Sequence, residues 1–339
     1  MSGNGRLSIR EIAAEGGVSV ATVSRVLNGT GNVIAGLRQR VVVAADQLGY
    51  RPNGVARSLR LRRTTTLGAV IPTITNPYFT DSVRAMQDAA AGYGYTLLVA
   101  NSDRDPAKEE TALTTLLDRR VDGVVLVSAA LAPAPSPALR AFLESGTPLV
   151  AMDRALPSLD LDRVVVDTRG GAREAVAHLV QRGRRRIACI AGPPSISTAT
   201  EKLAGYRDGL ADAGLPFEPA LVLPGDYTLE SGEAQARALL TLQPRPDAVL
   251  IANNLMMLGA FRVLLRRDVA IPDQVALVGY DDVAWTDAVR PALSVVAQPS
   301  YELGRRAVEL LVARLSGRRT EPQSIIEILP TNLIVRESS

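Results

Sequence analysis

One short stretch of the sequence combines a helical pattern with a surface of small and basic side chains. It runs Val18-Ser19-Val20-Ala21-Thr22-Val23-Ser24-Arg25-Val26-Leu27-Asn28-Gly29. Val23, Val26 and Leu27 recur at helical spacing, so one side of a helix can face a small core. The short or charged residues fall mostly elsewhere: Val20, Ala21, Thr22 and Arg25. Such a helix can enter a DNA groove, where an arginine offers two donors to a guanine edge.

Capping residues predict where this helix lies and indicate a second helix before it. Ser19 is expected to be its N-cap, and Asn28-Gly29 supplies a left-handed stop. Ser8 and Glu11 form a capping box that opens the preceding helix, and Gly16-Gly17 separates the two. Helix, glycine-bearing turn and helix make the helix-turn-helix pattern. On the pattern alone, an ordinary helical hairpin remains the alternative.

Charge is unevenly distributed along the 339 residues, which are enough for two or three domains. The formal net charge is only +3. However, residues 1–63 hold ten arginines and three acidic residues, net +7, whereas residues 64–339 carry net −4. The first fifth of the chain is therefore predicted to bind a polyanion, with a solvated basic face as the alternative.

Side chains for metal binding or covalent catalysis are scarce. Cys189 is the only cysteine, so no intramolecular disulfide forms and a reducing interior fits. His178 is the only histidine and lies between apolar neighbours in a predicted helix, where a structural role is expected. No run approaches the ~20 apolar residues of a membrane helix, and residues 1–5 contain no apolar segment of the kind a signal peptide needs. The sequence thus predicts a cytoplasmic protein that is not an enzyme and uses no membrane, metal or cofactor.

The basic region continues into a third helix and a short fourth one. Residues 37–48 carry an apolar face and stop at Gly49, so three short helices close one small core. Pro52 then ends any helix, and Asn53 caps a new one limited to residues 53–59. A helix this short is marginal alone in water, so it is expected to need a partner.

From Thr66 onward, buried runs alternate with amphipathic helical segments, the first three near 81–92, 107–120 and 138–144. The buried runs form a first set at 67–71, 95–100, 123–127 and 148–152 and a second at 163–167, 187–191, 221–223, 248–252 and 275–279. This alternation predicts parallel sheets covered on both faces. Two such halves predict a cleft with ligands beyond the carboxyl ends of the strands. Polar and aromatic residues, typical of sugar and nucleoside sites, occupy those ends at 72–79, 101–103, 153–154, 253–254 and 280–282.

Over about residues 7–337 the sequence resembles the LacI/GalR family of bacterial transcription regulators. The resemblance is carried by residues 18–28, 48–53 and 56–59 and by four motifs: Thr75-Asn76-Pro77-Tyr78-Phe79, Val121-Asp122-Gly123, Val278-Gly279-Tyr280-Asp281-Asp282 and Val296-Ala297-Gln298-Pro299. It implies a small all-α helix-turn-helix headpiece (1–52), a hinge helix and linker (53–63) and an effector-binding and dimerisation core (64–339). The core would be α/β, with two doubly wound parallel-sheet subdomains of the periplasmic-binding-protein kind. Their expected bounds are about 64–161 plus 294–323 and about 162–293 plus 324–339.

The family's manner of DNA binding implies a homodimer on a near-palindromic operator of double-stranded DNA. Val20, Ala21 and Arg25 would face bases in the major groove. The residues expected nearer the phosphates are Ser19, Thr22, Ser24, Asn28 and Tyr50. The hinge residues implied to contact DNA are Asn53, Ala56, Arg57, Leu59 and Arg60. Leu59 would enter the minor groove as a wedge that kinks the site.

The resemblance also implies a small-molecule effector between the two core halves. The matching positions are Tyr78, Phe79, Asp153, Lys202, Tyr227, Asn253 and Asp281, with Gln298 close by. Aromatic rings would stack on a sugar face, while Asp and Asn side chains accept from its hydroxyls. Each has an alternative: the Tyr78 and Phe79 rings as core, and the Asp153 and Asp281 carboxylates as caps at strand ends.

Four positions depart from the family's common pattern. Lys202 stands where an arginine is common, so a fork of donors becomes a point charge. Asn254 replaces a common aspartate and removes a charge from the cleft rim. Trp285 lies at a variable position, where packing is expected more than stacking. Ile34 replaces the usual hydroxyl cap of the third headpiece helix.

The sequence is therefore interpreted as a sequence-specific DNA-binding transcriptional regulator, expected to be a repressor. A carbohydrate-like ligand, meaning a sugar, sugar derivative or nucleoside, would control its affinity for the operator. One alternative is a solute-binding protein, against which the basic headpiece argues. Another is a sugar-acting enzyme with Asp153 and Asp281 as paired carboxylates, for which no glycine-rich phosphate loop is found. The third is a regulator whose co-effector is a phosphoprotein.

Overall fold

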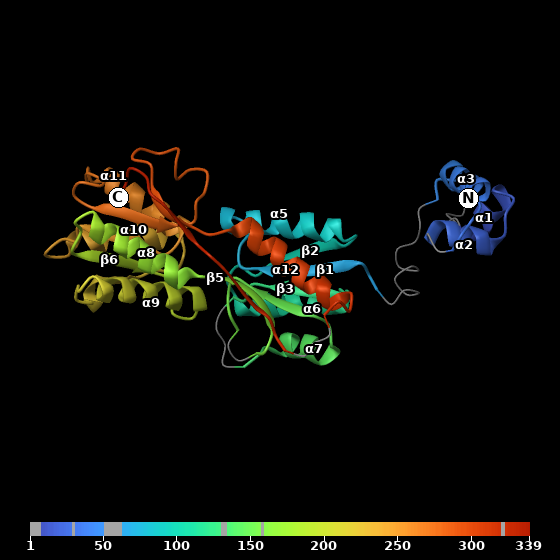
Figure 1. The fold of residues 1–339 in the computed structure, drawn as a ribbon, viewed down its shortest axis with the longest axis horizontal. Helices are drawn as coiled ribbons and strands as arrows, with labels where there is room; N and C mark the ends of the chain where they lie inside the picture. The colour runs from blue at the N-terminus through green and yellow to red at the C-terminus, as the bar shows by residue number, and fades with distance from the viewer. Residues whose placement is uncertain (1–7, 29–30, 51–62, 130–133, 157–158, 320–322) are drawn as a thin grey trace, which may run out of the picture. The chain divides into compact units, whose positions relative to one another are not determined.

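The computed structural model describes residues 8–28, 31–50, 63–129, 134–156, 159–319 and 323–339 (Figure 1). The chain divides into two compact units, residues 1–64 and 65–339. The first unit is the headpiece, and the second is the core. Each has a hydrophobic interior of its own.

The headpiece contains three helices, α1 (Ile9–Glu15), α2 (Val20–Asn28) and α3 (Ala35–Gln47). Ile12, Val23 and Val41, one from each helix, are fully buried together. The predicted capping box is present, with the Ser8 N–H donating to the Glu11 carboxylate at 2.5 Å. The helix expected at residues 37–48 begins two residues earlier. Its N-cap, Ile34, supplies no side-chain hydrogen bond.

The first lobe of the core is a six-stranded parallel sheet in the order β11-β5-β4-β3-β1-β2. Its strands are β1 (Thr66–Ile71), β2 (Thr96–Asn101), β3 (Gly123–Leu126), β4 (Leu149–Met152), β5 (Asp162–Val166) and β11 (Ile326–Leu329). One face packs against α5 (Pro77–Gly92) and α12 (Ser300–Leu315), the other against α6 (Pro106–Asp118) and α7 (Pro137–Ser145). Helix α5 begins before its expected start near residue 81, because Asn76 caps it by accepting from the Tyr78 N–H.

The second lobe is another six-stranded sheet, in the order β12-β10-β9-β8-β6-β7. Its strands are β6 (Ile187–Ala191), β7 (Val222–Pro224), β8 (Ala248–Ile251), β9 (Ala276–Tyr280), β10 (Ser294–Ala297) and β12 (Asn332–Ile334), of which β12 alone runs antiparallel within the described sheet. Helices α8 (Thr168–Gln181) and α9 (Ser197–Asp212) cover one face; α10 (Leu229–Thr241) and α11 (Asn254–Arg266) cover the other. A short 3-10 helix, η1 (Pro219–Leu221), precedes β7.

The expected division of the core into subdomains is wrong at three strands. Strands β5 and β11 were assigned to the second half but pair in the first sheet, and β10, assigned to the first half, pairs with β9 in the second. The chain therefore crosses between lobes after β5, after β10 and after β11. Among the described residues no helix lies between β4 and β5, so the alternation of strands and helices is interrupted there. The sequence therefore suggests that a new subdomain begins at β5.

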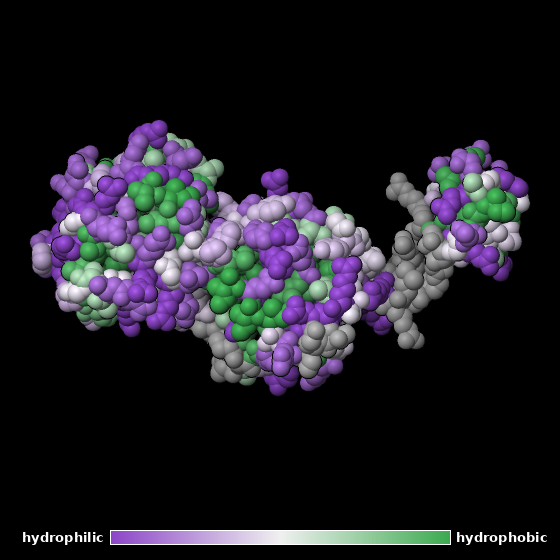
Figure 2. All heavy atoms as spheres, viewed as in Figure 1, coloured by the Kyte–Doolittle hydropathy of each residue, from purple (hydrophilic) through white to green (hydrophobic). Residues whose placement is uncertain are grey.

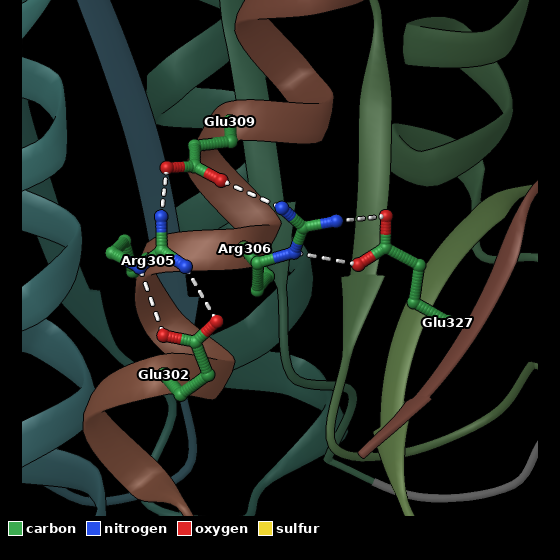
Figure 3. A network of polar contacts seen from close by, with 5 residues as sticks. All are labelled: Glu302, Arg305, Arg306, Glu309 and Glu327. Atoms are coloured by element: carbon green, nitrogen blue, oxygen red, sulfur yellow. Dashed lines mark hydrogen bonds and ion pairs between the residues drawn. The ribbon is translucent and has the colours of Figure 1, made fainter.

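Edge strand β11 is held to its lobe by an ionic network on α12 (Figure 3). The Arg306 guanidinium donates to both carboxylate oxygens of Glu327 at 2.9 Å. The remaining pairs join residues of α12 itself: Glu302 with Arg305, and Glu309 with Arg305 and Arg306. Apolar surface remains beside this region, between α12 and β5 in Figure 2. Ile326 and Ile328 on β11 are 49% and 63% exposed. The helix therefore anchors a strand whose outer edge has no neighbour among the described strands.

Candidate functional site

Helix α2 carries the predicted reading face of the headpiece. The Ser19 hydroxyl caps it by accepting from the Thr22 N–H at 3.1 Å, as the sequence predicts. Val23 is buried, whereas Ala21 and Arg25 are exposed and Val20 is 40% exposed. The three residues expected to face bases therefore lie on the surface of the same helix. Arg25 can present its donors outward from this face.

The turn between α1 and α2 is fixed by a side chain from α3. Arg40 Nη2 donates to the Gly17 carbonyl oxygen at 2.9 Å. Gly17 has φ +57°, and a Cβ there would lie 2.5 Å from Arg40 Nη2. The turn thus favours glycine for its left-handed backbone, and a Cβ there would displace the end of the Arg40 side chain. The sequence predicted the turn but not the arginine that holds it.

The other predicted DNA contacts are only partly within the described residues. Thr22 and Ser24 are half-buried on α2, and Tyr50 is half-buried against the headpiece core. Asn28 ends α2, but its side chain lies outside the described part of the chain. The hinge contacts also lie outside it: Asn53, Ala56, Arg57, Leu59 and Arg60. Their roles stay predictions from the sequence.

A cleft of about 440 Å³, reaching out to solvent, lies between the two lobes of the core. That volume includes open solvent; the space that the centre of a water molecule can occupy is about 40 Å³, so the cleft is narrow in this structure. The residues that line it are Thr73, Asn76, Tyr78, Phe79, Arg104, Asp153, Arg154, Thr198, Lys202, Tyr227, Asn253, Asp281 and Gln298. All eight positions predicted to contact an effector are among them. Five of these eight follow the carboxyl ends of β1, β4, β8 and β9, as the parallel sheets predict, whereas Lys202 lies on α9, Tyr227 follows β7 and Gln298 follows β10.

On the first lobe, Tyr78 and Asp153 form a buried polar pair. The Tyr78 hydroxyl donates to Asp153 Oδ1 at 2.7 Å, and both residues are 6% exposed. Burial raises the pKa of Asp153, while neighbouring Arg154 and the Tyr78 hydrogen bond oppose that rise. Burial and the Asp153 charge raise the pKa of Tyr78 well above 10. The Phe79 ring meets that of Tyr78 edge to face at 5.0 Å. Both rings belong to the core of the lobe as well as to the cleft wall.

On the second lobe, Lys202 places a buried charge at the cleft. Its Nζ donates to the Ala252 carbonyl oxygen at 2.9 Å and lies 4.0 Å from the Tyr280 ring centroid. Burial lowers the pKa of Lys202, and the carboxylates of Asp281 and Asp153 oppose that shift. The lysine is thus held by a carbonyl and an aromatic face, a geometry that suits a single point charge.

Asp281 is held from both sides. Its Oδ1 accepts from Gln298 Nε2 at 2.6 Å, and its Oδ2 accepts from Asn254 Nδ2 at 2.7 Å. Its neighbour Asn253 caps α11 by accepting from the Met256 N–H at 2.9 Å, and the Asn253 side chain also lines the cleft. The Asp281 carboxylate is thus fixed in position before any other group approaches it.

Residues with left-handed backbone gather at the cleft. Arg104, Asp153, Tyr227 and Asp281 have φ of 61°, 64°, 69° and 72°, and all four line it. Non-glycine residues in this region cost free energy and persist only where the surrounding structure holds them. Together with the buried charges, these conformations indicate a prearranged binding site.

No cluster of three metal-ligating side chains occurs among the described residues. Nor does any helix in the described ranges have the length and apolar character to cross a membrane. The cleft offers carboxylate and amide acceptors, cationic donors and aromatic rings. These groups bind a polar molecule through hydrogen bonds and ring contacts.

Comparison with known proteins assigns both units. Residues 8–53 match the family of bacterial regulatory proteins, lacI family, and residues 64–334 match the periplasmic binding proteins and sugar binding domain of LacI family. The chain belongs to the LacI family. It is therefore a DNA-binding transcriptional regulator with a helix-turn-helix headpiece and a periplasmic-binding-like core, as the sequence predicted.

Two relatives of this LacI-family protein are transcriptional regulators, and each aligns with it over nearly the whole length of both chains. The HTH-type transcriptional regulator CelR of Thermobifida fusca is 37% identical over 340 residues, 98% of each chain. The HTH-type transcriptional repressor CytR of Escherichia coli K12 is 30% identical over 332 residues, covering 98% of this chain and 96% of that one. These relatives confirm a regulator rather than an enzyme, and the headpiece match excludes a bare solute-binding protein.

Solved structures agree with the fold of this LacI-family chain. A CelR–cellobiose complex has a TM-score of 0.75 and 36% identity, covering 98% of this chain and 100% of that chain. The Lac repressor dimer bound to operator and the anti-inducer ONPF has a TM-score of 0.86 and 26% identity, with 98% and 99% covered.

Five cleft residues of this LacI-family core were missing from the predicted site: Thr73, Asn76, Arg104, Arg154 and Thr198. Three of them, Thr73, Asn76 and Arg154, stand in the strand-end segments already recognised as polar. Arg104 Nη1 reaches across the cleft to the carbonyl oxygens of Tyr227 at 3.1 Å and Asp226 at 3.3 Å. Thr198 follows β6 at the start of α9, and the segment after that strand was not among those recognised as polar from the sequence.

Packing explains one of the positions that depart from the family's common pattern. Trp285 is half-buried against the core of the second lobe. It does not line the cleft, so packing rather than stacking on a ligand accounts for it.

Proposed function

We propose that this regulator binds its operator as a homodimer and that a carbohydrate-like effector in the cleft controls that binding. The observation that carries the effector assignment is the pair of carboxylates, Asp153 and Asp281, held on opposite walls of one cleft beside the rings of Tyr78, Phe79 and Tyr227. Carboxylates accept from hydroxyl groups, and rings cover the apolar face of a sugar or a nucleobase.

The cations of the cleft favour a neutral, hydroxyl-rich ligand over a strongly anionic one. Lys202 is engaged by Ala252 and Tyr280, and Arg154 donates to the Ser128 and Ala129 carbonyl oxygens. A phosphate group in the cleft would be repelled by the two carboxylates, and the neighbouring cations already donate their hydrogen bonds to protein groups. The CelR–cellobiose complex shows that a related core holds a disaccharide, which supports the same class of ligand here.

The headpiece supports the DNA half of the proposal. We infer that α2 enters the major groove, with Val20, Ala21 and Arg25 toward the bases and Ser19 and the residues around it toward the phosphates. One headpiece covers one half-site, so a near-palindromic operator needs two copies. The Lac repressor dimer on its operator is a relative arranged in this way. A regulator that binds an operator must reach the DNA, which supports the proposal that this protein acts in the cytoplasm.

A ligand screen tests the effector assignment. The full-length chain is mixed with neutral sugars, sugar phosphates and nucleosides, and its thermal midpoint is measured. A neutral sugar or nucleoside is expected to raise the midpoint by mass action, and Asp281→Asn is expected to abolish the rise. Stabilisation by sugar phosphates alone, or by no member of the panel, would contradict the proposal. Adding the stabilising ligand to an operator-binding assay then shows whether it releases or promotes DNA binding.

A further inference from the structure

Asn254, the first residue of α11, forms hydrogen bonds with both lobes of the core. Its Nδ2 donates to Asn76 Oδ1 on the first lobe at 2.9 Å and to Asp281 Oδ2 on the second at 2.7 Å. Asn254 is fully buried, and Asn76 is 5% exposed. One amide group therefore connects the N-terminus of α5 to the end of β9 across the cleft.

The direction of both hydrogen bonds is determined by the neighbouring groups. Asn76 Oδ1 also accepts from the Tyr78 N–H at 3.1 Å, so the amide oxygen of Asn76 must lie at this end. The ionised Asp281 carboxylate can only accept, so the nitrogen of Asn254 must face it. The amide of Asn254 is thus the donor to both lobes, and no exchange of its nitrogen and oxygen preserves the arrangement.

The oxygen of the Asn254 amide shows that turning the nitrogen towards both acceptors costs free energy. Asn254 Oδ1 is buried and makes no hydrogen bond within the described residues. A buried unpaired amide oxygen is unfavourable, so the two bonds from Nδ2 are the ones that account for the residue. An aspartate, the common residue of the family here, has no N–H to donate and would set a second carboxylate beside Asp281.

We propose that Asn254 is an interlobe latch, a positioning residue that favours the closed cleft and holds the Asp281 carboxylate in place. A buried hydrogen bond is expected to change the ratio of closed to open cores roughly fivefold. Arg104 makes a second link, to the Tyr227 and Asp226 carbonyl oxygens, at a more exposed position. The Asn254 latch and the Arg104 link thus join the same two lobes, and Asn254 is the more deeply buried of the two residues.

The regulatory consequence rests on the proposed function. If only the closed core binds the effector, the apparent affinity for the effector falls in proportion to the fraction of cores that are closed. Because Asp281 is both the proposed effector contact and an acceptor of the latch, movement of the lobes and occupation of the cleft become coupled. Loss of the latch is then expected to weaken effector affinity up to about fivefold, from the same hydrogen bond.

The distance between the lobes tests the latch directly. Cysteines are introduced at Ala91 on α5 and Ala234 on α10, two exposed helix positions, and are spin-labelled. The native Cys189 is 3% exposed, and burial raises its pKa to about 12, so it stays unlabelled. Labelled full-length chains are mixed with an excess of unlabelled chains, so that distances between protomers do not contribute to the electron–electron resonance measurement.

Three variants break or keep the latch selectively. Asn254→Asp removes the donor. Asn76→Ser keeps a capping hydroxyl for α5, but its shorter side chain cannot reach Asn254. Both are expected to shift the closed-to-open ratio roughly fivefold towards longer distances. Asn76→Asp keeps the acceptor and the cap, so it is expected to retain the wild-type distribution.

A matched control separates the latch from a general effect of charge. Asn332→Asp makes the same chemical change at an exposed position on β12 of the second lobe, outside the cleft. Its distance distribution is expected to match the wild type. An equal shift in this control would overturn the proposal, as would an unchanged distribution in folded Asn254→Asp and Asn76→Ser. Should Asn254→Asp fail to fold, Asn76→Ser alone decides. Because neither ligand nor DNA is added, failure of the proposed function leaves the result unaffected.

Discussion

Replacing Tyr78 with phenylalanine removes one hydroxyl from the centre of the cleft. The hydroxyl donates to the buried Asp153 carboxylate at 2.7 Å. A hydrogen bond to a charged acceptor contributes about 1.5–3 kcal/mol, so Tyr78→Phe is expected to destabilise the core by about 2 kcal/mol at neutral pH. For a core of this size that corresponds to a fall in thermal midpoint of roughly 3–4 °C.

The pH dependence identifies the cause. Burial raises the pKa of Asp153, so the stability it contributes is full below the unfolded pKa and is lost as pH rises through the folded pKa. The Tyr78 bond favours the ionised form and limits this loss. Tyr78→Phe raises the pKa of Asp153 further. The difference in free energy of unfolding between variant and wild type is therefore largest at neutral pH. As pH falls below the raised pKa of Asp153 the carboxyl becomes protonated, and the difference narrows to that of a neutral hydrogen bond, about 1 kcal/mol.

Thermal unfolding followed by circular dichroism measures both quantities, at neutral pH and at the lowest pH where the wild type stays folded. Tyr93→Phe is the matched control, because the Tyr93 side chain is 45% exposed. It is expected to change stability by less than about 0.5 kcal/mol. A Tyr78→Phe effect no larger than that of the control, or one that does not change with pH, would refute the assignment of the buried pair.

Three further predictions concern other parts of the chain. Arg25→Ala is expected to cost about 1–3 kcal/mol of operator affinity and to relax preference at one base pair, measured against single-substituted duplexes; equal weakening on every duplex would argue for a phosphate contact instead. Gly17→Ala, which places a Cβ 2.5 Å from Arg40 Nη2, is expected to unfold the headpiece at lower temperature while leaving the transition of the core unchanged. Cys189 is expected to react with a thiol reagent only on unfolding; rapid reaction of the native protein would contradict its burial.

Five of the eight effector positions were predictable from a simple rule, and the other three, Lys202, Tyr227 and Gln298, came from the family resemblance alone. Buried runs such as those of β1 and β8 show where strands end, and parallel strands bring those ends to one edge of a sheet. Tyr78, Asp153, Asn253 and Asp281 follow such ends and meet in the cleft. The resemblance to a known family reached the same residues from motifs, so two kinds of reasoning agree at the strand-end positions.

Pairing between strands was harder to predict than the strands themselves. An apolar run shows that a segment is buried in a sheet, but it does not show which sheet. Strands β5, β10 and β11 were therefore placed in the wrong halves of the core. The same limit hid the cross-cleft contacts of Asn76 and Arg104, since these depend on how close the lobes come.

The central claim is that the headpiece reads a specific operator. The most direct measurement is selection of duplexes from a random library by the full-length chain, followed by titration of the selected and scrambled duplexes at several salt concentrations. A near-palindromic sequence is expected, bound at least about 10³-fold more tightly than the scrambled duplex, with affinity falling steeply as salt rises. Equal, weak affinity for every duplex at fixed salt would contradict the account.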